Sequence, residues 1–124
     1  MASKTVALRS AVQAKLKTLC DRVYYDHAEQ NADFPYLVFG AEEVQHDYGT
    51  ISCNLEVNAV DYGRDTATCE TLADNVQASL DKWCYLDDDI QFSAYCDRRN
   101  NVQEEDKKII RRRMIFEVRM HERS

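Results

Sequence analysis

The sequence predicts an α+β fold: a mostly antiparallel sheet of four to five strands with two helices packed on one face, in the order α-β-β-β-α-β-β. Two segments with helical apolar spacing and three segments that alternate apolar and polar residues indicate this class. A strand hairpin before and another after the second helix favour a single sheet. With 124 residues, 44% apolar and 31% charged, the chain is typical of one globular domain, residues 1–124.

The first helix is expected over residues 4–20. Its apolar stripe at helical spacing consists of Val12, Leu16 and Leu19. A brief extended segment over residues 22–25 follows it. Residues 26–33 are polar and have no periodicity, which is typical of a loop.

The first long strand is predicted over residues 34–39, which are aromatic, β-branched and apolar on both faces. Such a segment is expected to be buried, and Pro35 stands at its beginning. Gly40 then marks either a bulge or a close backbone approach. The strand is expected to continue through residues 41–47 and to turn at Tyr48 and Gly49.

The next strand, residues 51–59, shows the clearest period of two in the chain. Its apolar members are Ile51, Cys53, Leu55, Val57 and Ala59. A second helix is predicted over residues 66–83. The apolar stripe of this helix consists of Cys69, Leu72, Val76, Leu80 and Trp83.

Two further strands are predicted after the acidic turn at residues 87–89. The first alternates over residues 90–96, and a polar hairpin loop at residues 100–106 joins it to a last strand over residues 108–121. One face of the last strand carries Ile110, Met114, Phe116, Val118 and Met120. The other face carries Arg111, Arg113, Ile115, Glu117, Arg119 and His121.

The sequence offers no recognisable catalytic, cofactor or metal site. Five cysteines, at positions 20, 53, 69, 84 and 96, form no C-x-x-C pair, and their odd number excludes a fully paired disulfide framework, so we expect free thiols. The three histidines lie far apart, and neither a nucleotide-binding glycine motif nor a G-x-S-x-G motif is present. We therefore expect a protein that is not an enzyme.

Charge is distributed unevenly along the chain. The net charge is −6, but residues 1–97 hold 7 basic and 17 acidic residues, whereas residues 98–124 hold 9 basic and 5 acidic ones. Within the basic segment, Arg111 and Arg113 point to one face of the last strand together with Arg119, and Arg112 points to the apolar face. This arginine stripe meets DNA or an acidic protein surface, or it serves to block unwanted strand pairing; the sequence leaves these alternatives open.

One segment carries a resemblance to a known family. Val23-Tyr24-Tyr25-Asp26-His27-Ala28, a polar gap, and then Phe34-Pro35-Tyr36-Leu37-Val38-Phe39-Gly40 resemble the beginning of the first long strand in tail terminator proteins of tailed bacteriophages. These proteins are also called tail completion or tail-to-head joining proteins. The order and lengths of the other expected elements are similar to those of the family over nearly the whole chain.

The resemblance implies a virion structural protein that caps the tail tube, ends its polymerisation and forms part of the head–tail joint, typically as a hexameric ring. Its expected partners are further copies of itself, the tail tube protein and a head-completion or connector protein, with no membrane and with DNA only as passing cargo. It is expected in the tail of the virion, and in the bacterial host cytoplasm during assembly, since the sequence begins without the apolar segment of a signal peptide.

The candidate interface residues are Arg111, Arg113 and Arg119, together with Tyr48 in the turn between the first two long strands. The alternatives are another neck or minor capsid component, or a small nucleic-acid-binding module that uses the arginine-rich strand near the C-terminus. A small enzyme is a third class, which no motif favours.

Overall fold

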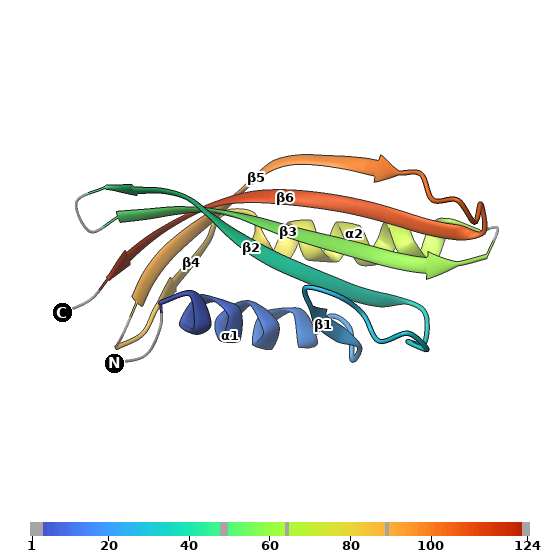
Figure 1. Cartoon of the computed structure of the whole chain (residues 1–124), viewed down its shortest axis with the longest axis horizontal. Coiled ribbons are helices and arrows are strands. Elements are labelled where there is room, and N and C mark those ends of the chain that lie inside the picture. The colour runs from blue at the N-terminus through green and yellow to red at the C-terminus, as the bar shows by residue number, and fades with distance from the viewer. Residues whose placement is uncertain (1–3, 48–49, 64, 89, 123–124) are drawn as a thin grey trace.

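A computed structural model of the chain describes residues 4–47, 50–63, 65–88 and 90–122 (Figure 1). Its elements are α1 (Lys4–Lys17), β1 (Val23–Tyr25), β2 (Tyr36–Asp47), β3 (Thr50–Tyr62), α2 (Ala67–Leu80), β4 (Trp83–Leu86), β5 (Ile90–Val102) and β6 (Ile109–Glu122). The strands form one sheet in the order β1-β2-β3-β6-β5-β4. The two long strands at its centre, β3 and β6, are paired along their whole length.

The strand count and the sheet class differ from the prediction. The sheet has six strands instead of four to five, and it is mixed, because β1 pairs in parallel with β2 while the other neighbours are antiparallel. The predicted mostly antiparallel sheet of four to five strands is therefore wrong, although the protein is α+β overall.

The additional strand is β4, whose first residue, Trp83, was predicted as the end of the second helix and whose remaining residues were assigned to no element. Trp83 continues the helical spacing of Leu80, so periodicity alone extends the helix to it. In the structure, α2 ends at Leu80, and Lys82 adopts a positive φ of 63° that turns the backbone. Trp83 then begins β4 and pairs with Ala94 of β5.

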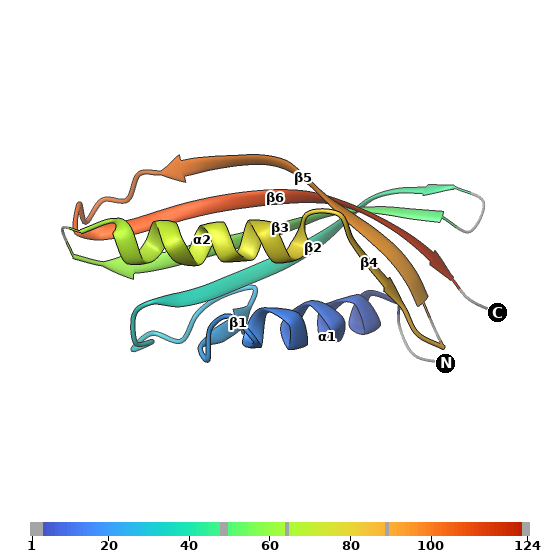
Figure 2. The same cartoon turned by 180° about the vertical axis from the view of Figure 1, so that it is seen from behind.

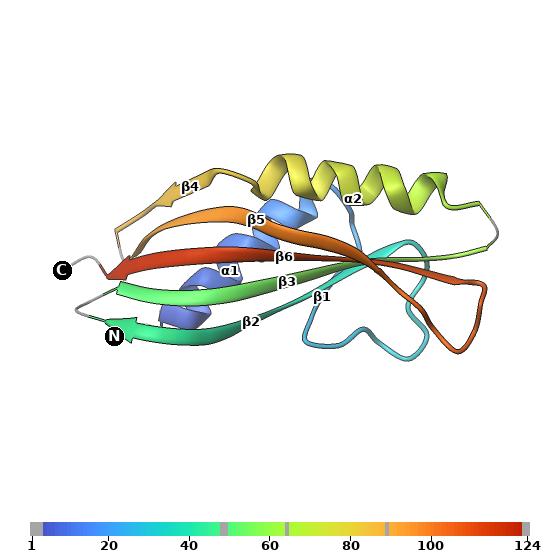
Figure 3. The same ribbon diagram turned by 90° about the horizontal axis from the view of Figure 1, so that it is seen from above.

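Both helices pack against the same face of the sheet, as Figures 2 and 3 show. On the central strands this face carries Cys53, Leu55, Val57 and Ala59 of β3 and Met114, Phe116, Val118 and Met120 of β6. Leu8, Val12 and Leu16 of α1 and Cys69, Val76 and Leu80 of α2 complete the same apolar core. The predicted alternation of β3 and β6 is thus confirmed, and it leaves the opposite face of the sheet without a helix.

The two ends of the elongated molecule differ. The beginning of α1, the end of β6 and the segment between β4 and β5 lie at one end (Figure 1). The segments that lead into β2, out of β3 and from β5 to β6 lie at the other end (Figure 1). The long strands of the sheet therefore run from one end of the molecule to the other.

Candidate protein–protein interface

The arginine stripe lies on the helix-free face of β6, as predicted. Arg111, Arg113 and Arg119 stand opposite Val60, Asn58 and Ser52 of β3. Arg112 lies on the helix-covered face, where its register partner is the buried Ala59. Strand geometry therefore separates this run of three arginines into two faces.

Each arginine of the stripe has an acidic neighbour within the chain. The pairs are Arg111 Nε with Glu104 Oε1 (2.6 Å), Arg113 Nη1 with Glu56 Oε1 (3.9 Å), and Arg119 Nε with Glu117 Oε1 (3.2 Å). The Arg119 side chain is 65% exposed, whereas those of Arg111 and Arg113 are 28% and 36% exposed. The stripe is thus a surface of paired charges, with Arg119 as its most accessible member.

The fourth predicted interface residue, Tyr48, lies outside the described residues. The structure therefore neither places it near the stripe nor separates it from the stripe.

A second feature of the helix-free face is an aromatic patch at one end of the sheet, formed by Tyr24, Phe34, Tyr36 and Tyr62. The ring centroids of Phe34 lie 5.4 Å from Tyr36 and 5.5 Å from Tyr62, and those of Tyr24 and Tyr36 lie 5.7 Å apart. Phe34 and Tyr62 are exposed. Burial raises the pKa of the Tyr36 phenol, and the nearby charge of Arg111 partly opposes that shift.

Sequence analysis missed this aromatic patch because its rings come from three separate segments. It assigned Phe34 to a buried strand, but β2 begins at Tyr36 and Phe34 is exposed. The available signal was Tyr62, which falls by strand alternation on the same face of β3 as the polar Ser52, Asn54 and Glu56. An aromatic residue at such a position is a candidate for a contact with another protein.

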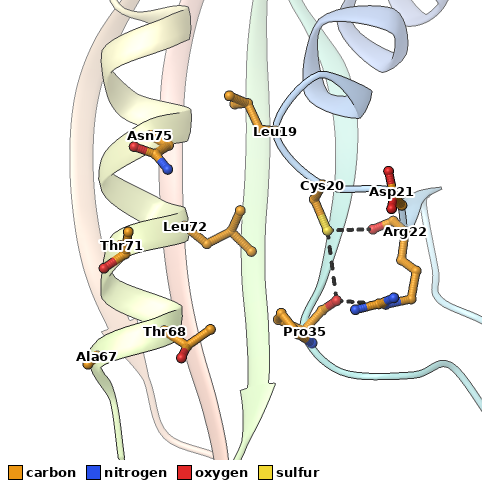
Figure 4. Close-up of a pocket in the computed structure, with 10 residues that line it drawn as sticks. All are labelled: Leu19, Cys20, Asp21, Arg22, Pro35, Ala67, Thr68, Thr71, Leu72 and Asn75. Atoms are coloured by element: carbon orange, nitrogen blue, oxygen red, sulfur yellow. Dashed lines mark hydrogen bonds between the residues drawn. The ribbon is translucent and has the colours of Figure 1, made fainter.

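The loop that carries Phe34 is held by a groove beside α1 and α2 (Figure 4). Arg22 Nε donates a hydrogen bond to the Pro35 carbonyl (3.0 Å), and Arg22 Nη2 donates to the Phe34 carbonyl (3.3 Å). The groove encloses about 490 Å³, and Leu19 and Leu72 extend into it from its two sides (Figure 4). The two hydrogen bonds from Arg22 fix the backbone of the loop that carries the Phe34 ring of the aromatic patch.

A shallow depression of about 430 Å³ lies on the helix-free face. Glu42, Glu56, Arg98 and Arg113 line it, so carboxylates and guanidinium groups face the same space. Gly40 also lines it, and a Cβ on this residue would lie 3.3 Å from Asp26 Oδ1. Gly40 thus leaves room for the Asp26 carboxylate, and the bulge of β2 lies between Glu43 and Gln45 rather than at Gly40.

The described residues contain no group of three or more histidine, cysteine or acidic side chains able to hold a metal ion. None of the helices in the described ranges has the length and apolarity needed to cross a membrane. The five cysteines are free thiols, as predicted.

The chain matches one protein family and several solved structures. Residues 4–121 match the family described as "Tail completion protein gp17". A chain in the solved structure "Virion of native gene transfer agent (GTA) particle" has the same fold, with a TM-score of 0.75 at 16% identity over 97% of this chain and 99% of that chain. No curated protein matches at the stringency applied. Because the family match spans almost the entire sequence, the chain belongs to the tail completion protein gp17 family of phage tail structural proteins.

Proposed function

We propose that this protein caps the tail tube, ends its polymerisation and forms part of the head–tail joint as a homo-oligomeric ring. Its partners in this proposal are neighbouring copies, the tail tube protein and a head-completion or connector protein. It acts in the virion tail after assembly in the bacterial cytoplasm. Family membership and the fold shared with a chain of a gene transfer agent virion support this assignment.

The paired charges of the arginine stripe are the observation that carries the protein-binding part of the proposal. DNA attracts a protein surface through an excess of unpaired positive charge. Here each stripe arginine has a carboxylate neighbour, and the chain as a whole has a net charge of −6. A surface of alternating charges suits a protein partner of complementary pattern, so Arg111, Arg113 and Arg119 are proposed to contact protein while DNA passes as cargo.

Deletion of the gene tests the proposal directly. We expect particles without functional head–tail joints, and electron microscopy should show tails of abnormal length that lack heads. Expression of the wild-type chain from a plasmid should restore tail length and infectious titre. Tails of normal length without heads would overturn the capping function and favour another neck component, and normal infectious particles would overturn the assignment altogether.

A further inference from the structure

The sheet has two open edges, because its outermost strands are short. β1 covers only Leu37–Phe39 of β2, and β4 covers only Gln91–Ala94 of β5. Beyond them, residues 40–45 of β2 and residues 97–102 of β5 have no further strand beside them within the described part of the chain. Unpaired strand edges present backbone donors and acceptors that pair readily with another strand.

The two edges present opposite charges on the helix-free face of the sheet. Residues 40–45 include Glu42 and Glu43 and no basic residue, and we call this segment the acidic edge. Residues 97–102, which we call the basic edge, include Asp97, Arg98 and Arg99. The Arg99 side chain pairs with Glu70 and Asp74 of α2, so Arg98 is the cation that this segment presents on the helix-free face. Glu42 and Arg98 are exposed, and register places both on the helix-free face, where their neighbours across the ladder are Asn54 and Ile115.

We propose that neighbouring copies in the ring join by strand pairing, with the acidic edge of one copy against the basic edge of the next. This inference rests on the ring of the proposed function. β2 and β5 run in opposite directions within the sheet, so a neighbour in the same orientation presents an antiparallel partner. Pairing between two identical edges is disfavoured because like charges would meet, so the contact is head-to-tail, which is the type that closes into rings.

β1 and β4 limit the register in which two copies can pair, because neither strand can occupy the same space as the edge strand of the neighbouring copy. Gly40 pairs with Glu56 of β3, and Glu56 pairs with Ile115 of β6, so Gly40 and Ile115 lie at the same height along the sheet. From this height the acidic edge extends towards Arg119. The basic edge extends from the same level towards Arg111. Pairing therefore displaces each copy along the strands by about four residues, or roughly 14 Å.

This displacement is compatible with a closed ring. Each copy contributes four strands, β2, β3, β6 and β5, between one contact and the next. At the usual spacing between strands, these four span a width of about 19 Å. The ratio of the two lengths corresponds to a strand tilt of about 36°, within the range found in closed barrels. In this register Glu42 of one copy lies opposite Asn100 of the next, and Arg98 lies on the diagonal within reach of its carboxylate.

Charge reversal at the two edges tests the proposal. The variants are expressed from a plasmid to complement the gene deletion described above. Glu42→Lys or Arg98→Glu alone should lower the infectious titre by about tenfold or more relative to the wild-type chain. Asp88→Lys makes the same charge change as Glu42→Lys on an exposed residue between β4 and β5, and it should leave the titre unchanged. Both edge variants should fold normally by circular dichroism, because the altered side chains are exposed.

Co-expression of the two defective variants separates a contact between copies from one within a copy. Glu42 and Arg98 line the same depression of a single chain, and a defect arising there would persist in the mixture. When the two variants alternate around the ring, the new lysine of one variant meets the new glutamate of the other. The unchanged Arg98 of the first variant meets the unchanged Glu42 of the second. Every contact then joins opposite charges, so the titre should recover. If the wild-type chain completes tails, then a normal titre for either single variant, or no recovery in the mixture, would overturn the edge pairing. Failure of the wild-type chain itself would remove the proposed function, and the edge pairing with it.

Discussion

The Nε–H of Arg112 on β6 donates a hydrogen bond to the Glu70 carboxylate on α2. Arg99 of β5 contacts the other oxygen of the same carboxylate, with Nη2 at 3.0 Å from Oε2. Glu70 therefore connects α2 to two strands at once. The middle arginine of the 111–113 run secures the fold, while its two neighbours face the opposite side of the sheet.

Glu70→Gln should lower the free energy of unfolding by about 1–3 kcal/mol, since it weakens two charge-assisted hydrogen bonds to partly buried arginines. Asp74→Asn is the matched control, because Asp74 also pairs with Arg99 but its side chain is 67% exposed. We expect the control to lose less than about 1 kcal/mol. Urea denaturation measures both, and equal losses would contradict the connecting function of Glu70.

All five cysteines should titrate as free thiols in protein denatured without reductant. Under native conditions, Cys84 is exposed and should react rapidly with a thiol reagent. Cys53 and Cys69 are buried and should react only as fast as the protein opens. A count of three or one thiols would reveal a disulfide, and rapid native reaction of Cys69 would contradict its burial.

Stability should decline in alkaline solution. Burial raises the pKa of the Cys53, Cys69 and Cys96 thiols above the ordinary value of 9.0. A pKa that is higher in the folded state means that the folded protein retains these protons more tightly, so the associated stability is complete below pH 9 and is lost as the pH rises through the folded values. Urea midpoints from pH 7 to pH 10 should fall, and Cys69→Ala should make the alkaline decline shallower. A midpoint that does not change over this range would contradict the expectation.

Leu80→Ala should cost about 2–5 kcal/mol of stability, because this side chain at the end of α2 is fully buried. Trp83→Ala should cost less, about 1–3 kcal/mol, because the ring is only half-buried. It packs edge-on against Phe92 at 4.9 Å. Chemical denaturation of both variants gives the comparison, and a Trp83→Ala loss under about 1 kcal/mol would mark the ring as a partner contact instead.

Arg119→Glu should leave the fold intact and impair assembly. The side chain is 65% exposed, and its contact with Glu117 is a surface pair of little energetic value. Thermal unfolding should therefore be unchanged within about 0.5 kcal/mol, while the reversed charge opposes a protein partner. Arg111→Glu is a useful comparison, because it places like charges beside Glu104 and should also lower stability. Full infectious titre with Arg119→Glu would contradict an interface at this residue.

The faces of β3 and β6 could be predicted from sequence because period-two alternation records burial directly. The same alternation separated Arg112 from Arg111 and Arg113. Trp83 was misassigned because the i+3 spacing that it shares with Leu80 fits both a helix and the strand that follows a sharp turn. The parallel pairing of β1, the aromatic patch and the open edges depend on segments distant in sequence, and local patterns carry no information about such pairings.

The position of the chain ends has a practical consequence for imaging. The beginning of α1 and the end of β6 lie at the same end of the molecule (Figure 1). The beginning of β2 and the end of β3, which carry Tyr36 and Tyr62 of the aromatic patch, lie at the other end (Figure 1). A gold or fluorescent label attached at the beginning of α1 or at the end of β6 therefore marks the same pole, and it leaves Phe34 and Tyr62 unobstructed. Measuring whether such a label sits on the head side or the tube side of the proposed joint gives the polarity of the protein in the particle.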